Sequence, residues 1–237
     1  MKTLSLVIPC FNESKNIPLL LNRCSEVVSD DMIEIILVDN GSTDDTSNVL
    51  DSLESKFPFL VRVRVEENNG YGHGILAGLE KASGKIIGWT HADMQTDPGD
   101  ALKGLYLFQK SENPKELFLK GKRYGRPIID LVFTIGMSVF ETILLRKLMW
   151  DINAQPTMFH RDFYLSWSSP PDDFSLDLYA YFMAKKARLK VMRFPVLFSE
   201  RIHGSSHWNI NLSSKIKFIK RTLSYSINLS RRMKHNA

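Results

Sequence analysis

Three polar side chains stand at alternate positions just after an apolar run in the middle of the chain. They are His91, Asp93 and Gln95, each separated from the next by one apolar residue. In an extended segment alternate residues point to the same side, so an imidazole, a carboxylate and an amide would face one point. Divalent cations accept these groups as ligands, and the triplet predicts half of a metal coordination shell. The alternative is a polar strand end that opens a loop.

The apolar run at 85–90 predicts the buried strand that carries this motif, and Pro98 suits the first turn of a following helix. The same order recurs along the chain. Apolar runs predict further strands at 4–10, 33–38, 60–65, 117–120 and 191–198, and helical spacing predicts helices at 14–28, about 49–53, 75–82, 100–109 and 174–185. This alternation predicts an α/β fold with a mostly parallel, Rossmann-like sheet and helices on both faces.

Four polar clusters follow predicted strands, at 12–13, 39–40, 68–74 and 91–95. The carboxyl ends of parallel strands meet at one edge of a sheet, where ligands bind in open α/β folds. Four clusters in register therefore indicate a binding site at that edge. Lys122 and Arg123 follow the strand at 117–120 and could bind phosphate, although a solvated basic loop would look the same.

Composition favours one globular domain, because 237 residues that are 43% hydrophobic can bury a large core. Cys10 and Cys24 are too few for a disulfide framework, which favours a reducing compartment. The first apolar run is short and broken by Pro9, so we expect a first strand there and not a signal peptide.

Two segments near the end of the chain are amphipathic. Residues 128–150 are strongly apolar but contain four charged residues, which argues against a transmembrane helix and favours one in the membrane interface or packed on the body. The segment 211–237 is basic and has apolar residues at 212, 216, 219, 223 and 227. It predicts a separate C-terminal helix after a domain at 1–210. That helix could dock on the core or lie on a membrane. Nucleic acid is not expected as a partner, because no aromatic–basic interleaving accompanies the charge.

Six motifs in order resemble those of a known family. They are IPCFNE (8–13), VDNGSTDDT (38–46), NGYG (69–72), HADMQ (91–95), GKR (121–123) and RIHGSS (201–206). Together they resemble the family 2 glycosyltransferases of the GT-A fold, and within them the branch of dolichol-phosphate mannose synthases and polyprenyl-phosphate sugar transferases. The resemblance covers nearly the whole chain.

This resemblance implies roles for particular residues. Pro9, Phe11, Glu13, Asp39 and Asn69 would contact the donor nucleotide, and Arg123 and Arg201 would contact its phosphates. Ser206 would lie in a mobile loop that closes over the donor. Asp93 and Gln95, with His91, would hold Mg²⁺ or Mn²⁺ at the diphosphate of a nucleotide-diphospho-sugar. A cation and an arginine would stabilise the charge of the leaving group, which makes Asp93 and Arg201 the expected catalytic residues.

The chain departs from the family pattern at three places. His91 replaces the usual first Asp of the Asp-x-Asp motif, Asn40 replaces an acidic residue, and Asp172–Asp173 stand where a basic residue often precedes the acid at Asp177. With His91 the metal site could lose a hard ligand, gain an imidazole that tolerates Mn²⁺ better than Mg²⁺, or be rebuilt. The change at Asn40 is mild, and the one at Asp172–Asp173 weakens the assignment of a lipid-phosphate acceptor. A phosphate acceptor is already ionised, whereas a hydroxyl needs a general base, for which Asp173 and Asp177 are candidates. Helix capping is an equally good explanation of both.

We therefore expect an inverting, hexosyltransferase-type enzyme with a polyprenyl phosphate acceptor, in the cytoplasm and peripheral on the cytoplasmic face of the membrane. A hydroxyl of a surface glycan or of a lipid-linked oligosaccharide is the alternative acceptor. A catalytically inactive protein of the same fold, which binds a nucleotide or a membrane, is the alternative outside enzymes. The sequence leaves the sugar, the nucleotide base and the oligomeric state open.

Overall fold

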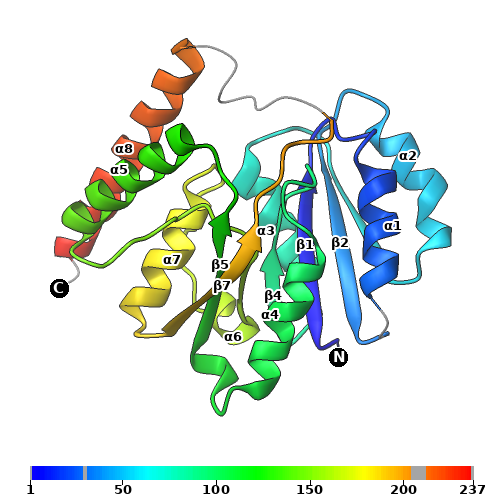
Figure 1. The fold of residues 1–237 in the computed structure, drawn as a ribbon, viewed down its shortest axis with the longest axis horizontal. Helices are drawn as coiled ribbons and strands as arrows, with labels where there is room; N and C mark the ends of the chain where they lie inside the picture. Colours follow the sequence, from blue (N-terminus) through cyan, green and yellow to red (C-terminus); the bar gives the residue numbers. More distant parts are fainter. Residues whose placement is uncertain (1, 29–30, 204–211, 236–237) are drawn as a thin grey trace.

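A seven-stranded sheet with helices on both faces forms the body of the protein (Figure 1). The computed structural model describes residues 2–28, 31–203 and 212–235. The strands are β1 (Leu4–Cys10), β2 (Ile33–Asn40), β3 (Leu60–Val65), β4 (Ile86–Trp89), β5 (Leu117–Tyr124), β6 (Thr157–His160) and β7 (Lys190–Leu197). Their order in the sheet is β3-β2-β1-β4-β6-β5-β7. Only β6 runs antiparallel to its neighbours, so the prediction of a mostly parallel sheet is confirmed.

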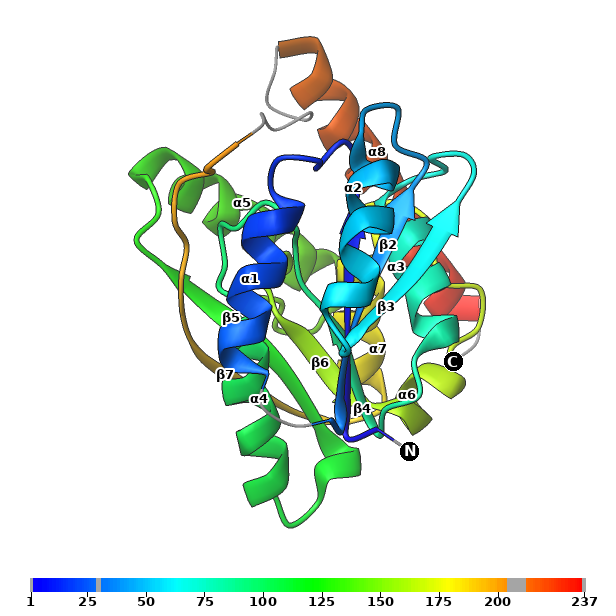
Figure 2. The same ribbon diagram turned by 90° about the vertical axis from the view of Figure 1, so that its right-hand side faces the viewer.

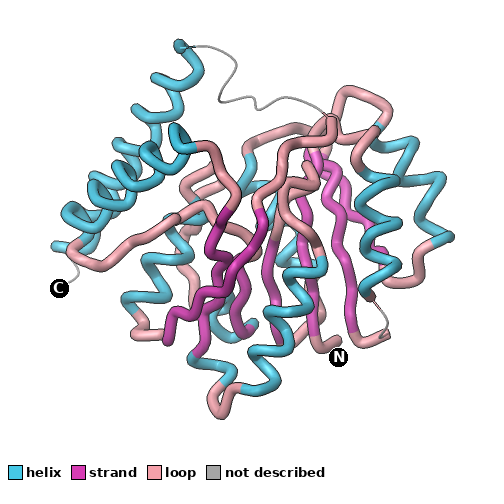
Figure 3. Tube along the Cα trace, in the orientation of Figure 1, coloured by secondary structure: helices cyan, strands magenta, loops and turns pink. Residues whose placement is uncertain are grey.

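The helices form two layers that bury the sheet (Figure 3). Helices α1 (Ile17–Val27), α2 (Thr46–Leu53) and α4 (Gly99–Lys110) pack on one face. Helices α3 (Tyr71–Lys81), α6 (Arg161–Leu165) and α7 (Leu176–Lys186) pack on the other. Short 3₁₀ turns at Glu54–Lys56 and Pro114–Glu116 precede β3 and β5. The strands β1 and β2 are buried on both sides, which explains their nearly continuous apolar sequence.

Two longer helices, both labelled in Figures 1 and 2, are in contact with each other beside the sheet. They are α5 (Ile128–Leu145) and α8 (Leu212–His235). The prediction that α5 reaches Trp150 is wrong, because Arg146 takes a left-handed conformation with φ 53° that ends the helix. Residues 151–156 form turns, and the strand β6, for which no strand was predicted, begins at Thr157.

The helix predicted at 75–82 begins four residues earlier, at Tyr71. Close packing explains the glycines around this start. Gly70 has φ 123°, and a Cβ there would lie 2.5 Å from the carbonyl oxygen of Asp172. A Cβ on Gly72 would lie 2.6 Å from the carbonyl oxygen of Asp173. The glycines therefore let the start of α3 approach the loop before α7, and this brings two distant parts of the chain together.

Candidate functional site

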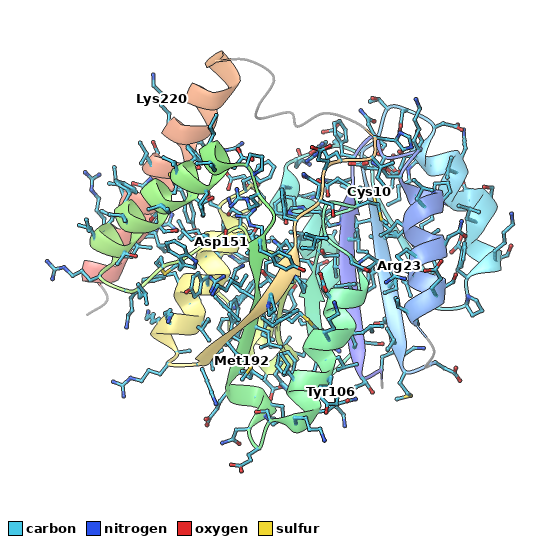
Figure 4. The ribbon with its side chains drawn as sticks, in the orientation of Figure 1. Cys10, Arg23, Tyr106, Asp151, Met192 and Lys220 are labelled. Carbon is cyan, nitrogen blue, oxygen red and sulfur yellow. The ribbon has the colours of Figure 1, made fainter. Side chains whose placement is uncertain are left out.

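One large cavity of about 780 Å³ opens at the carboxyl ends of the strands. Its walls come from the segments after β1, β2, β4, β5 and β7, and from α5, α7 and α8. Figure 4 shows Cys10 at the carboxyl end of β1 and Asp151 below α5, on two sides of this region. We call the part beside β1, β2 and β4 the donor end, and the part beside α5, α7 and α8 the acceptor end.

Most of the predicted site residues line this cavity. They are Pro9, Phe11, Glu13, His91, Asp93, Gln95, Arg123, Asp173, Asp177 and Arg201. Asp39 and Asn69 are not among the described residues that line it. Asp39 is buried and accepts a hydrogen bond from the backbone N–H of Ser42, while Asn69 is exposed and its neighbour Asn68 lines the wall. Ser206 lies outside the described residues.

Asp93, Gln95 and Arg201 meet at the donor end. A terminal nitrogen of Arg201 lies 2.7 Å from Asp93 Oδ2, and its Nε donates to Gln95 Oε1 at 3.1 Å. The Gln95 amide also donates to the backbone oxygen of Ser199, which fixes its orientation. A carboxylate and an amide oxygen thus point at one cationic group. Such hard oxygen ligands suit a divalent cation that completes its shell with phosphate and water.

The backbone at this motif bends instead of extending. Met94 has φ 57°, so the prediction that alternation puts three ligands on one side is wrong. His91 packs its ring 5.5 Å from that of Tyr71, and burial lowers the pKa of the imidazole. Within residues 2–28, 31–203 and 212–235 no three His, Cys, Asp or Glu side chains form a group that could hold a metal. A metal role for His91 remains a prediction.

Glu13 lies near Asp93 at the same end of the cavity. Burial raises the pKa of Glu13, and the charge of Asp93 raises it further, although a hydrogen bond from Asn16 opposes both. The Glu13 backbone N–H donates to Thr46 Oγ1, which ties the end of β1 to the start of α2. The donor end is therefore crowded with carboxylates, and an added cation would be stabilised there.

An aromatic column separates the two ends of the cavity. Tyr71 stacks on Phe174 with ring centroids 4.8 Å apart and planes 9° from parallel, and His91 lies on the other side of Tyr71. The guanidinium of Arg221, from α8, lies 5.6 Å from the centre of the Phe174 ring. The close glycine contacts at the start of α3 place Tyr71 in this position. The column thus connects the metal motif to the C-terminal helix.

Asp177 is a buried hub of hydrogen bonds. Gln155 Nε2 donates to its Oδ1 at 2.8 Å, and the indole N–H of Trp89 donates to the same oxygen at 3.2 Å. Lys120 Nζ lies 3.7 Å away and donates to Thr157 Oγ1 at 2.6 Å. Lys120 is fully buried, and burial lowers its pKa to about 8. These contacts give Asp177 a structural role. A general base, by contrast, needs a carboxylate oxygen that is free to take a proton.

Asp173 is also engaged. Its Oδ1 accepts the backbone N–H of Ser175 just before α7, and its Oδ2 lies 3.1 Å from Arg221 Nε. The first contact is a turn before α7 and not a helix cap, because Ser175 holds the N-cap position and α7 has no side-chain cap bond. The second links α7 to α8 across the acceptor end.

Arg123 and Arg126 share one carboxylate beside α5. Arg123 Nε donates to Asp151 Oδ1 at 3.0 Å, and a terminal nitrogen of Arg126 lies 3.8 Å from the same oxygen. Burial alone would raise the pKa of Asp151, but Arg123 lowers it. Both guanidiniums lie over the Phe198 ring, at 5.3 and 5.4 Å. Arg126 Nε is buried with no hydrogen-bond partner among the described residues. Asp130 also lines this part of the cavity, so the wall brings two guanidiniums and two carboxylates together.

Several residues at the acceptor end were not predicted. Arg126 could have been predicted from its position three residues after Arg123, because two cations so close to a strand end can share a ligand. Arg221 was seen only as part of a basic helix, and Glu141 only as a charge that interrupts an apolar segment. Their places depend on contacts across 48 and 85 residues of sequence, between Arg221 and Asp173 and between Ser226 and Glu141.

Comparison with known proteins agrees with this geometry. The family model described as glycosyl transferase family 2 matches residues 5–124, just over half of the chain. The chain belongs to that family. The match includes β1 to β5, the donor-end motifs from Pro9 to Gln95 and Arg123, whereas Arg201 lies beyond it.

Curated relatives match part of this family 2 member. An undecaprenyl-phosphate 4-deoxy-4-formamido-L-arabinose transferase from Pseudomonas syringae is 36% identical over 104 residues, which are 41% of this chain and 30% of the relative. A protein of the same name from Photorhabdus laumondii is 33% identical over 103 residues, 41% of this chain and 31% of the relative. The matched region spans about a third of the length of these relatives.

Solved structures resemble almost the whole chain. Glucosyl-3-phosphoglycerate synthase from Mycobacterium tuberculosis, in complex with Mn²⁺, UDP and glucosyl-3-phosphoglycerate, has a TM-score of 0.69 at 17% identity. The match covers 97% of this chain and 80% of that one. A mannosyltransferase from Pyrobaculum calidifontis, in complex with GDP-mannose and Mn²⁺, has a TM-score of 0.64 at 18% identity, with 86% and 58% covered. At these identities the likeness shows the fold, and the fold is GT-A.

Proposed function

We propose that this protein is an inverting glycosyltransferase that moves a sugar from a nucleotide-diphospho-sugar to a polyprenyl phosphate at a membrane surface. One observation carries the choice of acceptor. Arg123 and Arg126 share the single carboxylate of Asp151 on the wall of the acceptor end, and Arg126 keeps a buried Nε without a hydrogen-bond partner among the described residues. A phosphate would supply an acceptor for that nitrogen and could bind both guanidiniums.

The donor end fits a nucleotide-diphospho-sugar. Phe11 offers a ring and Glu13 a carboxyl group beside β1, where family resemblance places the nucleoside, while Asp93, Gln95 and Arg201 lie at the expected place of the diphosphate. The curated relatives are named as transferases and two of the similar structures contain UDP or GDP-mannose, which supports this assignment.

Asp93 and Gln95 would hold Mg²⁺ or Mn²⁺. Their oxygens already converge on one cationic group, the Arg201 guanidinium, so the donor set fits a cation that takes its other ligands from phosphate and water. When bound, the ion would neutralise charge that develops on the leaving diphosphate. Arg201 would contact the same diphosphate, because both groups occupy this end of the cavity.

The proposed acceptor chemistry follows from the carboxylates of Asp173 and Asp177, which already have hydrogen-bond or ion-pair partners. In the proposed reaction, an acceptor phosphate oxygen forms a bond to the anomeric carbon while the bond from that carbon to the diphosphate oxygen breaks on the opposite side. The acceptor is already ionised and no proton has to move. This agrees with the hydrogen bonds that occupy Asp177 and the ion pair that occupies Asp173. A hydroxyl acceptor would need one of them released as a base.

The outer surface of α5 supports a membrane location. Ile129, Ile128 and Ile143 are 83%, 79% and 73% exposed, and the helix is long and apolar enough to cross a bilayer. However, Ser138 and Glu141 on the same helix are buried against the body and α8, which favours a helix lying in the interface. In α8, Ile227 belongs to the predicted apolar stripe and is exposed, while Ser226 and Leu229 face inward. We propose attachment to the cytoplasmic face.

The test compares acceptors that differ only in charge. The purified protein, a labelled nucleotide-sugar and Mn²⁺ are incubated with vesicles that contain polyprenyl phosphate, the uncharged polyprenol, or an added oligosaccharide. We expect transfer to the phosphate alone, and Arg126→Gln should raise the KM for that acceptor with a smaller change for the donor. Transfer to the oligosaccharide and none to the phosphate would replace this proposal by the hydroxyl-acceptor function. No transfer in any mixture would favour the inactive protein.

A further inference from the structure

Glu141 is a fully buried carboxyl group on the otherwise apolar helix α5. Its Oε1 lies 2.5 Å from the hydroxyl oxygen of Ser226, which is itself fully buried on α8. Its Oε2 has no hydrogen-bond partner among the residues that the structure describes. A carboxyl group in this position either carries a proton or leaves a charged oxygen buried between α5 and α8, and the second state is costly.

The hydrogen bonds around Ser226 favour the protonated state. Ser226 Oγ lies 2.5 Å from Glu141 Oε1 and 2.9 Å from the backbone oxygen of Thr222, yet a serine hydroxyl has a single hydrogen. If Glu141 is neutral, its own proton serves the first contact and the serine hydrogen serves the second. If Glu141 is ionised, both neighbours of Ser226 are acceptors and one contact loses its hydrogen. Protonation therefore completes the connection between the two helices.

The docking of α8 also shapes the cavity. Arg221 and Thr222 line the acceptor end, one helical turn before Ser226. Helix α8 is also attached by the ion pair from Arg221 to Asp173, by a hydrogen bond that Ser230 Oγ donates to the backbone oxygen of Leu144 at 3.3 Å, and by Leu229 and Tyr225, which pack on the core. The ion pair and the hydrogen bond lie near the surface, since neither Arg221 nor Ser230 is buried. Compared with this ion pair and this hydrogen bond, the Glu141–Ser226 contact is buried.

We propose that Glu141, in its protonated form, is a positioning residue that fastens α8 to α5 and thereby fixes Arg221 and Thr222 at the acceptor end. Ionisation of Glu141 weakens this fastening and loosens that wall of the cavity. The inference rests on the proposed function only for the ligand that binds there. The fastening itself needs neither donor nor acceptor.

The charged groups around this contact pair with other residues, so burial is the main cause of the change in the pKa of Glu141. Asp173 and Arg221 pair with each other, and Arg126, on the α5 side, lies 3.8 Å from Asp151. Asp130 also lines the cavity from α5, and Tyr225 on α8 is a phenol whose pKa burial raises. Burial raises the pKa of Glu141 from 4.5 to about 7, against a smaller opposing effect of the Ser226 hydrogen bond.

The sign of the pH effect follows. With α8 undocked, Glu141 would meet water and titrate near 4.5, whereas with α8 docked it titrates near 7. The contribution of Glu141 to docking is therefore complete below about pH 4.5. It is lost as the pH rises to about 7, above which Glu141 is ionised with α8 docked or undocked. A difference of about 2.5 pH units corresponds to a loss on the order of 100-fold in the docking equilibrium.

Hydrogen exchange of the unliganded protein between pD 5 and 7.5 tests this inference, with each rate divided by the intrinsic rate at that pD. We expect opening of peptides from 220–232 to increase by 10- to 100-fold across this range, while peptides from β1 and β2 change little. Glu141→Gln keeps the hydrogen-bond donor without the charge, so its α8 should remain protected at all pD values. Glu112→Gln, an exposed residue after α4, is the matched control and should behave as the wild type.

Two results would overturn the inference. They are constant protection of α8 in the wild type, and a pH dependence that persists unchanged in Glu141→Gln. If Glu141→Gln does not fold, Ser226→Ala tests the same contact between α5 and α8. It keeps a good helix former but removes the bridging hydroxyl, so α8 exchange at pD 5 should rise toward the wild-type value at pD 7.5. Wild-type protection in Ser226→Ala would contradict the proposal.

Discussion

Removing the Arg201 charge should strengthen metal binding in the absence of nucleotide. Arg201 occupies both oxygen ligands proposed for the divalent cation, through Asp93 Oδ2 at 2.7 Å and Gln95 Oε1 at 3.1 Å. The Arg201 side chain is 28% exposed and that of Asp93 only 7%, so water screens the pair weakly. Mn²⁺ must displace the guanidinium or share its ligands. Arg201→Gln should therefore increase Mn²⁺ affinity while it leaves Asp93 and Gln95 in place.

The magnitude follows from the contacts that the cation has to break. A partly buried hydrogen bond to a charged group contributes about 1.5–3 kcal/mol. Because about 1.4 kcal/mol changes an equilibrium constant tenfold, Arg201→Gln should tighten Mn²⁺ binding by roughly 10- to 100-fold. Lys122→Gln is the control, since it removes one positive charge from an exposed residue next to Arg123 and should change the affinity little.

The assay is titration of Mn²⁺ monitored by the electron paramagnetic resonance signal of the free ion, with and without a nucleoside diphosphate. With the diphosphate present, the order should reverse. Arg201 is then attracted to phosphate, so its loss should weaken the joint binding of metal and nucleotide. An Mn²⁺ affinity of Arg201→Gln that equals or falls below that of wild type without nucleotide would refute the argument that arginine and metal compete for these oxygens.

Three further predictions follow from the fold and the site. Asp93→Ala should abolish sugar transfer with the circular dichroism spectrum unchanged; turnover within tenfold of wild type would exclude Asp93 from the reaction. Ile129→Glu should reduce sedimentation with anionic vesicles, whereas Leu165→Glu, an exposed leucine at the end of α6, should not; equal effects would contradict the membrane role of α5. Gly78→Ala should lower the free energy of unfolding by about 1–3 kcal/mol in urea, because its Cβ would lie 2.4 Å from Val7 Cγ1; unchanged stability would show that this contact relaxes freely.

The strands and their polar ends could be predicted because both signals are local. Apolar runs of strand length fixed β1 to β4, and the rule that parallel strands present their carboxyl ends at one edge predicted that Glu13 and Asp93 would line the same cavity. The bend at Met94 was missed, since a left-handed residue other than glycine or asparagine has no reliable sequence signal. Asp93 and Gln95 still converge, but on Arg201 and through a turn.

The acceptor end could not be predicted because its contacts are distant in sequence. Asp173 and Asp177 stood out as candidate bases, yet their partners Arg221, Trp89 and Gln155 come from three other elements. A periodic pattern shows that a helix has an apolar stripe but not what the stripe faces. In α8 the inward face carries Ser226 and Leu229, while Ile227 of the stripe is exposed, and only the packing on α5 reveals this arrangement.

The most direct test of the account is the product formed by the wild-type protein. A panel of nucleotide-sugars is incubated with Mn²⁺ and polyprenyl phosphate in vesicles, and the lipid fraction is analysed by mass spectrometry and for its anomeric configuration. The account predicts one lipid-linked sugar monophosphate with the configuration opposite to that of the donor. Retention of configuration, or a sugar attached to a glycan hydroxyl with the lipid phosphate unmodified, would contradict it.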